Sequence, residues 1–301
     1  MNGSQIVIPV RDYDLAATLT SGQAFRWRKC DGWWEGVVSA HWVRVKQSDE
    51  TLVAQAAEPV TDWHWLACYL QTDVNLEAIL QTFPQDEAMR ASVAACRGLR
   101  LLRQDPWECL ASFILSSTKQ IIQIQQIVRS LCECFGTPVA APSGHAPEYA
   151  FPTAQQIANA SEAGLRGCKM GFRAPNLLAT AKMVAGGEID LGALAAQDCE
   201  TARTALVQLP GVGEKIANCV LLFAYGFQEA FPVDVWVRKA LFQLYFPRRR
   251  PSPQRLMNFT RTYFAPNSGY AQQYLFHYMR SHAPRLPKKS VGKRPRKRHS
   301  K

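Results

Sequence analysis

Lys215 and Asp234 are the two side chains whose types and spacing best suit covalent chemistry in this sequence of 301 residues. Lys215 follows the turn Gly211-Val212-Gly213 and lies in the first turn of an expected helix, where the helix dipole and any partial burial disfavour the ammonium. A neutral amine is a nucleophile. Asp234 follows Pro232-Val233 and is expected to cap the N-terminus of the next helix. A carboxylate held there would face a cation that develops beside the lysine.

The segment that contains Lys215 predicts a helix-hairpin-helix. An apolar lead-in at residues 206–210 meets the glycine turn, and a second helix begins at Glu214 with apolar residues at helical spacing. Gly211 and Gly213 permit a tight turn whose backbone N–H groups point outward and favour a phosphate. Such a hairpin binds a nucleic-acid backbone without reading its sequence. Taken alone, a Gly-Val-Gly turn is more often an ordinary connection, and it matches neither the dinucleotide-binding fingerprint nor the phosphate-binding loop of nucleotide hydrolases.

The elements that must position these residues indicate an α+β fold. Residues 6–55 predict an antiparallel sheet with strands over 24–28, 33–38 and 42–46, and residues 61–69 and 76–96 have helical spacing. Beyond Arg97 the pattern is almost wholly helical. We therefore expect a sheet domain in residues 1–97, a helical domain with the hairpin in residues 98–284 and a basic tail in residues 285–301. In the helical domain the first expected helix covers residues 106–117 and continues to residue 132, and a loop is expected at 138–152. The other expected helices are 154–160, 161–167, 173–185, 191–194, 198–208, 214–224, 235–246, 253–264 and 269–281.

The net charge of +11 is concentrated at the C-terminal end of the sequence. Residues 285–301 contain nine Lys or Arg and no acid, so residues 1–284 carry 26 basic and 24 acidic side chains. Such a run is commonly a solvated segment, and its functional interpretations are phosphate attraction or a localisation signal. No apolar run approaches a membrane span, and the first residues lack the pattern of a secretory signal, so we expect an intracellular protein. Nine scattered cysteines predict free thiols.

Four segments together resemble the helix-hairpin-helix, Gly-Pro-Asp family of base-excision DNA glycosylases, and within it the 8-oxoguanine DNA glycosylase/AP lyase branch. They are residues 21–27, 101–110, 170–174 and 206–239. The resemblance implies a TBP-like sheet domain and a bifunctional enzyme acting on duplex DNA that contains 8-oxoguanine. In such an enzyme Asp234 would stabilise oxocarbenium character at the deoxyribose C1′, and Lys215 would form a Schiff base that permits β-elimination. It also implies no cofactor, a monomer, and a DNA-associated location in the cytoplasm, the nucleoid or a nucleus.

The resemblance places the damaged base among Gly22, Cys219, Gln272 and Phe276. The Gly22 carbonyl would accept the N7 hydrogen that oxidised guanine has and guanine lacks. Cys219, one helical turn beyond Lys215, would form the opposite wall, while Gln272 and Phe276 would contact the edge and face of the base. The structural alternatives are a helix-ending glycine, a core thiol, a solvated amide and a core aromatic.

The resemblance also gives roles on the opposite strand to the turn at residues 170–173, which is expected to expose Phe172 and Arg173. Phe172 would fill the gap left by the flipped base, and Arg173 would bind the orphaned cytosine; their structural alternatives are a helix staple and a surface charge. Many family members carry three asparagines where this chain has Thr118-Lys119-Gln120, and Gln123 replaces a second arginine. We therefore expect a weaker preference for cytosine opposite the lesion than in members with both arginines.

No metal is expected, apart from a monovalent cation that the carbonyls of Leu209, Gly211 and Gly213 could bind.

Two alternative functions remain open. The first alternative is a monofunctional glycosylase for alkylated or mismatched bases, whose members generally lack the lysine. The second is a non-catalytic helix-hairpin-helix DNA-binding protein, which gives no reason for Lys215 and Asp234 to occupy the matching positions.

Overall fold

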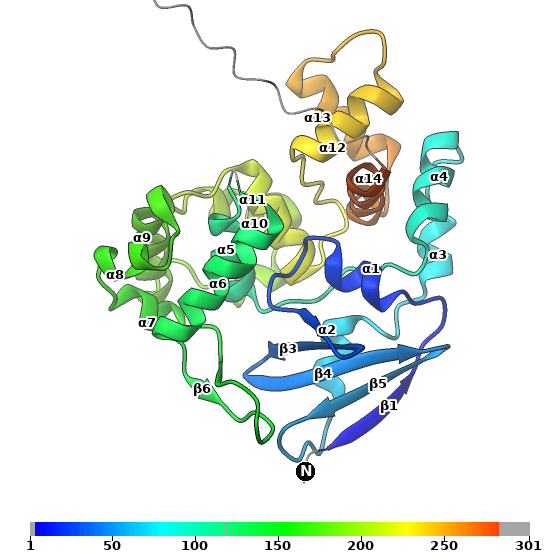
Figure 1. Ribbon diagram of the computed structural model, residues 1–301. Coiled ribbons are helices and arrows are strands. Elements are labelled where there is room, and N and C mark those ends of the chain that lie inside the picture. The colour runs from blue at the N-terminus through cyan, green and yellow to red at the C-terminus, as the bar shows by residue number, and fades with distance from the viewer. Residues whose placement is uncertain (1–3, 118, 283–301) are drawn as a thin grey trace, which may run out of the picture.

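A computed structural model describes residues 4–117 and 119–282, in which an antiparallel sheet lies beside a larger group of helices (Figure 1). The expected α+β fold is confirmed. Thr118 and the expected basic tail lie outside the described residues. None of the helices in the described ranges is long and apolar enough to cross a membrane.

The sheet has five strands in the order β1-β5-β4-β3-β2, and all neighbours are antiparallel. Alternating residues bury one face, so that Val43, Val45, Leu52 and Ala54 lie fully buried in a core with helices α1 and α2. These elements are β1 (Gln5–Pro9), α1 (Leu15–Thr20), β2 (Arg28–Cys30), β3 (Trp33–Val38), β4 (His41–Ser48), β5 (Thr51–Ala56) and α2 (His64–Leu70).

Two expectations in the first hundred residues are wrong. Most of the segment expected to be a strand at 24–28 is not paired in the sheet, since pairing with β3 begins only at Arg28. This segment instead connects the sheet to the helical part, and the Gln23 carbonyl just before it accepts from Gln104 Nε2 at 2.8 Å. The helix expected at 76–96 is two helices, α3 (Leu76–Leu80) and α4 (Glu87–Cys96). Asp86 begins the second by accepting from Met89 N at 2.8 Å.

The helical part follows the expected order closely, and its apolar faces form one large core. The loop expected at 138–152 contains a short hairpin of two strands. The elements are α5 (Pro106–Leu115), α6 (Ile121–Phe135), β6 (Pro138–Val139), β7 (Glu148–Tyr149), α7 (Ala154–Ala158), α8 (Glu162–Gly167), η1 (Gly171–Arg173), α9 (Ala174–Ala185), η2 (Ala193–Ala196), α10 (Cys199–Val207), α11 (Glu214–Val220), η3 (Leu221–Tyr225), α12 (Val235–Ala240), η4 (Leu241–Tyr245), α13 (Pro253–Tyr263) and α14 (Ser268–His282).

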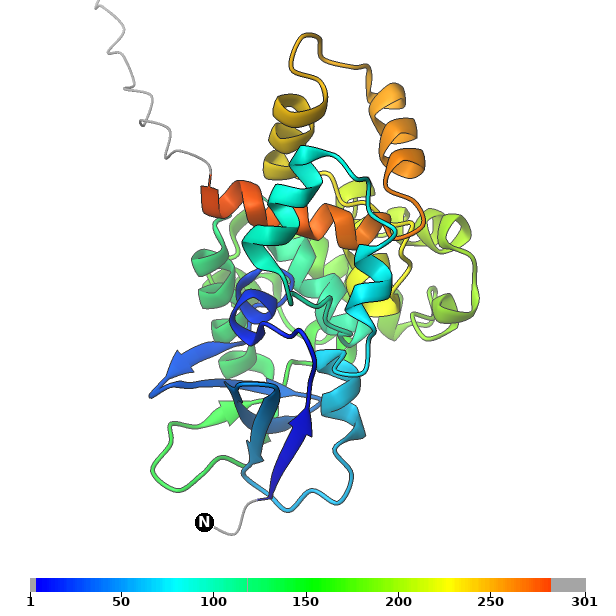
Figure 2. The same ribbon diagram turned by 90° about the vertical axis from the view of Figure 1, so that its right-hand side faces the viewer.

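The last helix ties the two parts together. Helix α14 contacts α4 and α12 and crosses below the hairpin that α12 and α13 form (Figure 2). Gln273 Nε2 donates to the Ser21 carbonyl at 2.9 Å, and Tyr274 Oη donates to the Leu99 carbonyl at 3.2 Å. Residues near the C-terminal end of the described chain are thereby fixed against the turn that follows α1.

Candidate active site

The glycine hairpin before α11 is supported by α9. Gly211 has φ 79°, and a Cβ at this position would lie 2.8 Å from Asn176 Cβ, so the turn needs glycine both for its backbone and for its close approach to α9. Thr180 Oγ1 donates to the Pro210 carbonyl at 2.9 Å. Gly213 caps α11, is exposed, and has open space beside it. The helix-hairpin-helix is confirmed, and its open N-terminal end suits an anionic ligand.

Lys215 projects from the first turn of α11 towards the end of α5. Its side chain is half-buried, and Nζ donates to Ser116 Oγ at 3.3 Å. The ammonium also lies 5.2 Å from the centre of the Phe113 ring. The sequence does not indicate a role for Ser116, because a serine just after a helix carries no signal for a contact 99 residues away. The lysine is thus held by one hydroxyl and one aromatic face.

Asp234 caps α12, as the sequence predicts. Its Oδ1 accepts from Val237 N at 2.8 Å. Burial raises the pKa of Asp234, while that N–H bond and the charge of Lys215 act in the opposite direction. Lys215 and Asp234 interact electrostatically, yet no ion pair joins these two described residues. Both groups are therefore available to a reacting atom that enters their surroundings.

The structure brings Gly22 and Phe276, two of the four residues expected to surround the damaged base, close together. A Cβ on Gly22, where φ is 78°, would lie 2.8 Å from Ile121 Cδ1 and 3.4 Å from Phe276 Cε1. Gln272 is 3% exposed, and no partner within the described residues satisfies its Oε1. The solvated alternative for Gln272 is therefore wrong. A buried amide oxygen of this kind suits a ligand that brings its own donor.

Cys219 lies on the face of α11 that carries Lys215. Burial raises the pKa of Cys219 to about 11, although the nearby Lys215 charge lowers it. The residue is therefore a neutral thiol at physiological pH, suited to forming a wall and not to acting as a nucleophile.

The turn that contains Gly22 is held in place by a residue that the sequence did not reveal as functional. Gln23 Nε2 donates to the Thr18 carbonyl at 2.9 Å and to the Arg100 carbonyl at 2.8 Å, while its Oε1 accepts from Leu102 N. All of these groups are buried, so the network fixes the backbone on both sides of Gly22.

The side chains expected to meet the opposite strand are arranged differently. Phe172 is 62% exposed, as expected, but Arg173 is only 2% exposed, so the expectation of an exposed guanidinium is wrong. Arg173 Nη1 donates to the Met170 carbonyl at 3.2 Å, and the guanidinium lies 4.3 Å from the Phe172 ring. Burial lowers the pKa of Arg173. The exposed Gln123 accepts a hydrogen bond through Oε1 from Gln120 N at 3.1 Å and so caps the N-terminus of α6.

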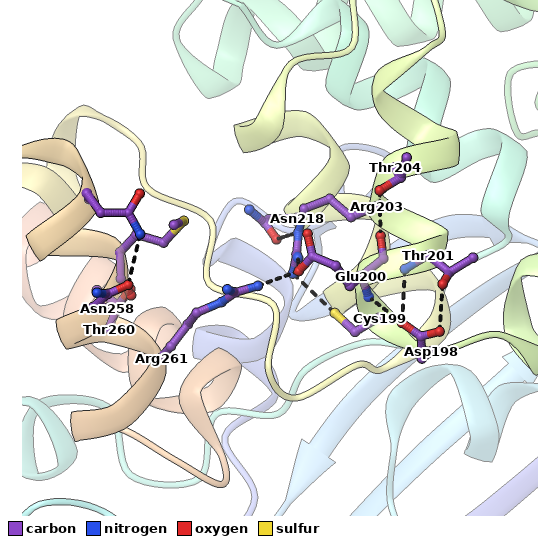
Figure 3. A network of polar contacts seen from close by, with 12 residues as sticks. Asp198, Cys199, Glu200, Thr201, Arg203, Thr204, Asn218, Asn258, Thr260 and Arg261 are labelled. Carbon is purple, nitrogen blue, oxygen red and sulfur yellow. Dashed lines mark hydrogen bonds and ion pairs between the residues drawn. The ribbon is translucent and has the colours of Figure 1, made fainter.

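A network of polar contacts connects α13 to the hairpin helices (Figure 3). Glu200 on α10 pairs with Arg203 of the same helix and with Arg261 of α13. Arg203 Nε also donates to Asn218 Oδ1 at 3.0 Å, one turn beyond Lys215 on α11. These residues line a cavity of about 540 Å³ that also includes Lys215. The network joins the helix that carries Lys215 to the helix pair that begins at Asp234.

Comparison with protein families finds two consecutive matches. The family described as 8-oxoguanine DNA glycosylase, N-terminal domain, matches residues 5–110. The family described as HhH-GPD superfamily base excision DNA repair protein matches residues 111–266.

Two curated relatives illustrate the similarity. A probable N-glycosylase/DNA lyase of Methanothermobacter thermautotrophicus is 28% identical, over 91% of this chain and 95% of the relative. The N-glycosylase/DNA lyase OGG1 of Arabidopsis thaliana is 30% identical, over 74% of this chain and 64% of the relative.

Two solved structures share the architecture over nearly their whole length. MBOgg1 in complex with a low affinity DNA ligand superposes with a TM-score of 0.87 at 32% identity, covering 92% of this chain and 96% of the other. The Clostridium acetobutylicum 8-oxoguanine glycosylase/lyase, bound to double-stranded DNA containing cytosine opposite 8-oxoguanine, gives a TM-score of 0.84 at 29% identity and covers 93% and 99% of the two chains.

Proposed function

Because the chain belongs to the HhH-GPD superfamily of base excision DNA repair proteins, we propose that it is a bifunctional 8-oxoguanine DNA glycosylase/AP lyase. The observation that carries this proposal is that Lys215, in the first turn of α11, interacts electrostatically with Asp234, at the start of α12. A DNA-binding protein without catalytic activity does not need a half-buried carboxylate that interacts with a half-buried lysine. The names of the similar proteins support the same activity.

The reaction begins with cleavage of the bond between C1′ of the deoxyribose and the base. The electron pair of that bond leaves with the base nitrogen, and the ionised Asp234 stabilises the positive charge that develops on C1′ and the ring oxygen. The departing base takes one proton from the Lys215 ammonium, and the lone pair that this leaves on Nζ forms a bond to C1′. A second Nζ proton passes to the ring oxygen as the bond between that oxygen and C1′ breaks, which gives a protonated imine. In this step Ser116 Oγ, which accepts a hydrogen bond from Nζ, can orient the amine.

The second reaction is cleavage of the strand. The protonated imine acidifies the C2′ hydrogen, so a base removes that proton and the electron pair forms a C2′–C3′ double bond. The 3′ phosphate leaves with the electrons of the C3′–O bond. Hydrolysis of the imine releases Lys215 and the cleaved strand. These steps use only side chains and water.

Gly22 is proposed to select the oxidised base. Its carbonyl would accept the N7 hydrogen of 8-oxoguanine, whereas guanine would place an acceptor there and leave both groups unpaired, which costs about 1–3 kcal/mol for a buried group. The packing of Gly22 against Phe276, and the buried Gln272 oxygen, support a pocket for a flat polar base. Cys219 would form its other wall.

On the opposite strand we propose that Phe172 fills the gap and Arg173 binds the estranged cytosine. For this, Arg173 must leave the Met170 carbonyl and its stacked position when DNA binds. The Gln123 side chain is shorter than an arginine, is neutral, and already caps α6 through its bond from Gln120 N. Selectivity for cytosine would therefore be weaker than in relatives with a second arginine. Thr118, which the resemblance places near the same base, lies outside the described residues.

The backbone of the hairpin is proposed to bind a phosphate of the lesion strand. A monovalent cation could join it at the carbonyls of Leu209, Gly211 and Gly213; the Leu209 carbonyl accepts from Val212 N at 3.0 Å and keeps a second lone pair for such an ion. We expect the protein to act as a monomer inside the cell, without an organic cofactor.

A substrate panel separates this proposal from its alternatives. Duplexes with 8-oxoguanine or with 3-methyladenine would be incubated with the protein, and free base and strand cleavage would be measured separately. We expect release of 8-oxoguanine together with cleavage. Release of 3-methyladenine without cleavage would favour the monofunctional alternative, and binding without release of either base would leave the non-catalytic one.

A further inference from the structure

Charge is divided unevenly along the chain at Asp234, which is the last acidic residue of the sequence. Residues 1–234 contain all 24 acids and 18 Lys or Arg, whereas residues 235–301 contain 17 Lys or Arg and no acid. The excess is not confined to the basic tail, because eight of these cations lie between residues 235 and 282. A folded part of the helical domain is therefore strongly positive.

Seven of those eight cations belong to one structural unit, residues 235–263, which we call the cationic hairpin. It consists of α12 with its continuation η4, a loop at 246–252, and α13, and it projects from the molecule above α14 (Figure 2). The loop carries the exposed Arg248, Arg249 and Arg250 between two prolines. The helices carry the exposed Arg238, Arg255 and Arg261 and the half-buried Lys239.

The cationic hairpin is anchored at its base, and its outer cations remain available. Phe264 lies fully buried against Tyr245 and Phe259, and Tyr263 Oη donates to Asp86 Oδ2 at 2.9 Å. Within the described residues, the pair of Arg261 with Glu200 is the only ion pair that this unit makes (Figure 3). The other six cations form no salt bridge there, although Arg238 interacts electrostatically with Asp234, and Lys239 and Arg250 lie over the rings of Trp236 and Phe242. Unpaired guanidinium groups on a rigid support suit binding of phosphates.

The cationic hairpin forms a wall of the cavity that contains Lys215. This cavity is lined on one side by Glu214, Lys215 and Asn218, and on the other by Arg238, Gln254 and Arg261. The loop itself curves around a second hollow of about 520 Å³, which Arg248, Arg249, Arg250 and Arg255 line. Cations of the cationic hairpin thus lie both on the wall of the cavity that contains Lys215, which Glu200, Glu214 and Glu229 also line, and at the tip of the loop.

The length of the first helix sets a scale for what the loop can reach. From Asp234 to the loop, α12 and η4 span residues 235–245, a rise of about 17 Å at 1.5 Å per residue. Along one DNA strand successive phosphates are about 3.4 Å apart in the axial direction. For a duplex that runs alongside α12, the loop therefore reaches phosphates up to about five base pairs from a base held at Asp234.

We propose that the cationic hairpin binds the backbone of the duplex that contains the lesion, about five base pairs to one side of it. The inference rests on the proposed function, because it places the lesion at Lys215 and Asp234. Its ligand is duplex DNA, bound through phosphates and without sequence preference. The loop would lengthen the footprint of the enzyme beyond the glycine hairpin and so strengthen binding to long DNA.

The test compares Arg248→Ser/Arg249→Ser/Arg250→Ser with the wild type on two duplexes. One has 15 base pairs on each side of the lesion, and the other has about three, which is too short to reach the loop. On the long duplex we expect KM to rise about tenfold and the slope of log KM against log salt to fall by about two to three, with an unchanged rate constant for base release. On the short duplex the two proteins should have equal KM values.

A matched variant controls for net charge. Arg11→Ser/Lys29→Ser/Lys46→Ser removes three cations from the sheet domain and should leave KM and its salt slope as in the wild type. An unchanged salt slope in the loop variant, or an equal loss in the control or on the short duplex, would overturn the proposal.

The proposed function can fail separately. If the wild type releases no 8-oxoguanine, the dissociation constants of the same variants for the undamaged long duplex still measure the contribution of the loop. A loop variant that binds this duplex as tightly as the wild type would then contradict the docking surface itself.

Discussion

The proposed pocket for the damaged base and the turn proposed to face the opposite strand differ in how complete they are in the structure. In the pocket, groups from remote parts of the chain already meet: Gly22 approaches Phe276, and Lys215 contacts Ser116. In the turn, Phe172 is exposed, but Arg173 is folded onto the Met170 carbonyl. Under the proposed function, the residues assigned to the chemistry are therefore already in place, whereas Arg173 would have to rearrange to contact the partner strand.

The strongest test of the preorganised half is Asp234→Asn. Asparagine is as good a helix cap as aspartate, so α12 should persist while the charge is lost. We expect the single-turnover rate constant for release of 8-oxoguanine to fall on the order of 10³-fold, because the developing cation loses its counter-charge. A variant that keeps a tenth of the wild-type rate would contradict the role of Asp234.

The same variant separates catalysis from stability. Burial raises the pKa of Asp234 above its unfolded value, so the protonated form favours the folded state, and this contribution is lost as the pH rises through the folded pKa. At pH 7 we expect Asp234→Asn to have a Tm equal to or above that of the wild type. The difference should shrink below about pH 4, where both proteins are neutral at this position.

Gly22→Ala tests whether Gly22 lines the proposed pocket for the damaged base. The added methyl group would lie against Ile121 and Phe276, where the damaged base is proposed to stack, so base release should slow by about 100-fold, or about 2.7 kcal/mol. Gly32→Ala is the matched control, because its φ of 81° carries the same backbone strain but nothing lies within 4 Å of its Cβ. Equal rates of base release for the two variants would contradict the assignment of Gly22 to the base pocket.

Phe172→Ala tests the turn that is proposed to face the opposite strand. Because the ring is 62% exposed, we expect the free energy of unfolding to change by less than about 0.5 kcal/mol. Release of 8-oxoguanine should slow about tenfold, since unstacking a base costs a few kcal/mol. Cleavage at a preformed abasic site should be unaffected, because no base has to be flipped. Val7→Ala, on an exposed sheet residue, is the control.

The smallest expected effect belongs to Gln123→Arg. A second guanidinium beside the estranged base should raise the ratio of excision opposite cytosine to excision opposite adenine by about fivefold. The variant also loses the bond to Gln120 N, which should cost about 0.5–1 kcal/mol of stability. Gln126→Arg, one turn further along α6, should leave the ratio unchanged. The same ratio for both variants would show that residue 123 does not face that base.

Local patterns were sufficient to predict the catalytic elements. A glycine turn before an apolar helix predicted α11 from Glu214, and an aspartate after Pro-Val predicted the cap of α12. Both signals lie within a few residues of the feature that they specify. The resemblance added Phe276, which approaches Gly22 from the last helix, and the family to which it pointed is confirmed.

Long-range polar contacts could not be predicted in this way. Nothing in the sequence near Ser116 or Gln23 indicates that they hold Lys215 and the Gly22 turn, because these contacts join segments 99 and 77 residues apart. The burial of Arg173 was also missed. A charged residue in a turn is usually solvated, and here a carbonyl and an aromatic ring of the same turn compensate for its burial.

Borohydride trapping tests the central claim most directly. The wild type and Lys215→Gln would be mixed with an 8-oxoguanine duplex in the presence of the reductant, and the covalent complex would be digested and mapped by mass spectrometry. We predict a single adduct on Lys215 that is absent from the variant. Release of the base without any trapped complex, or an adduct on another residue, would contradict a Schiff-base mechanism at Lys215.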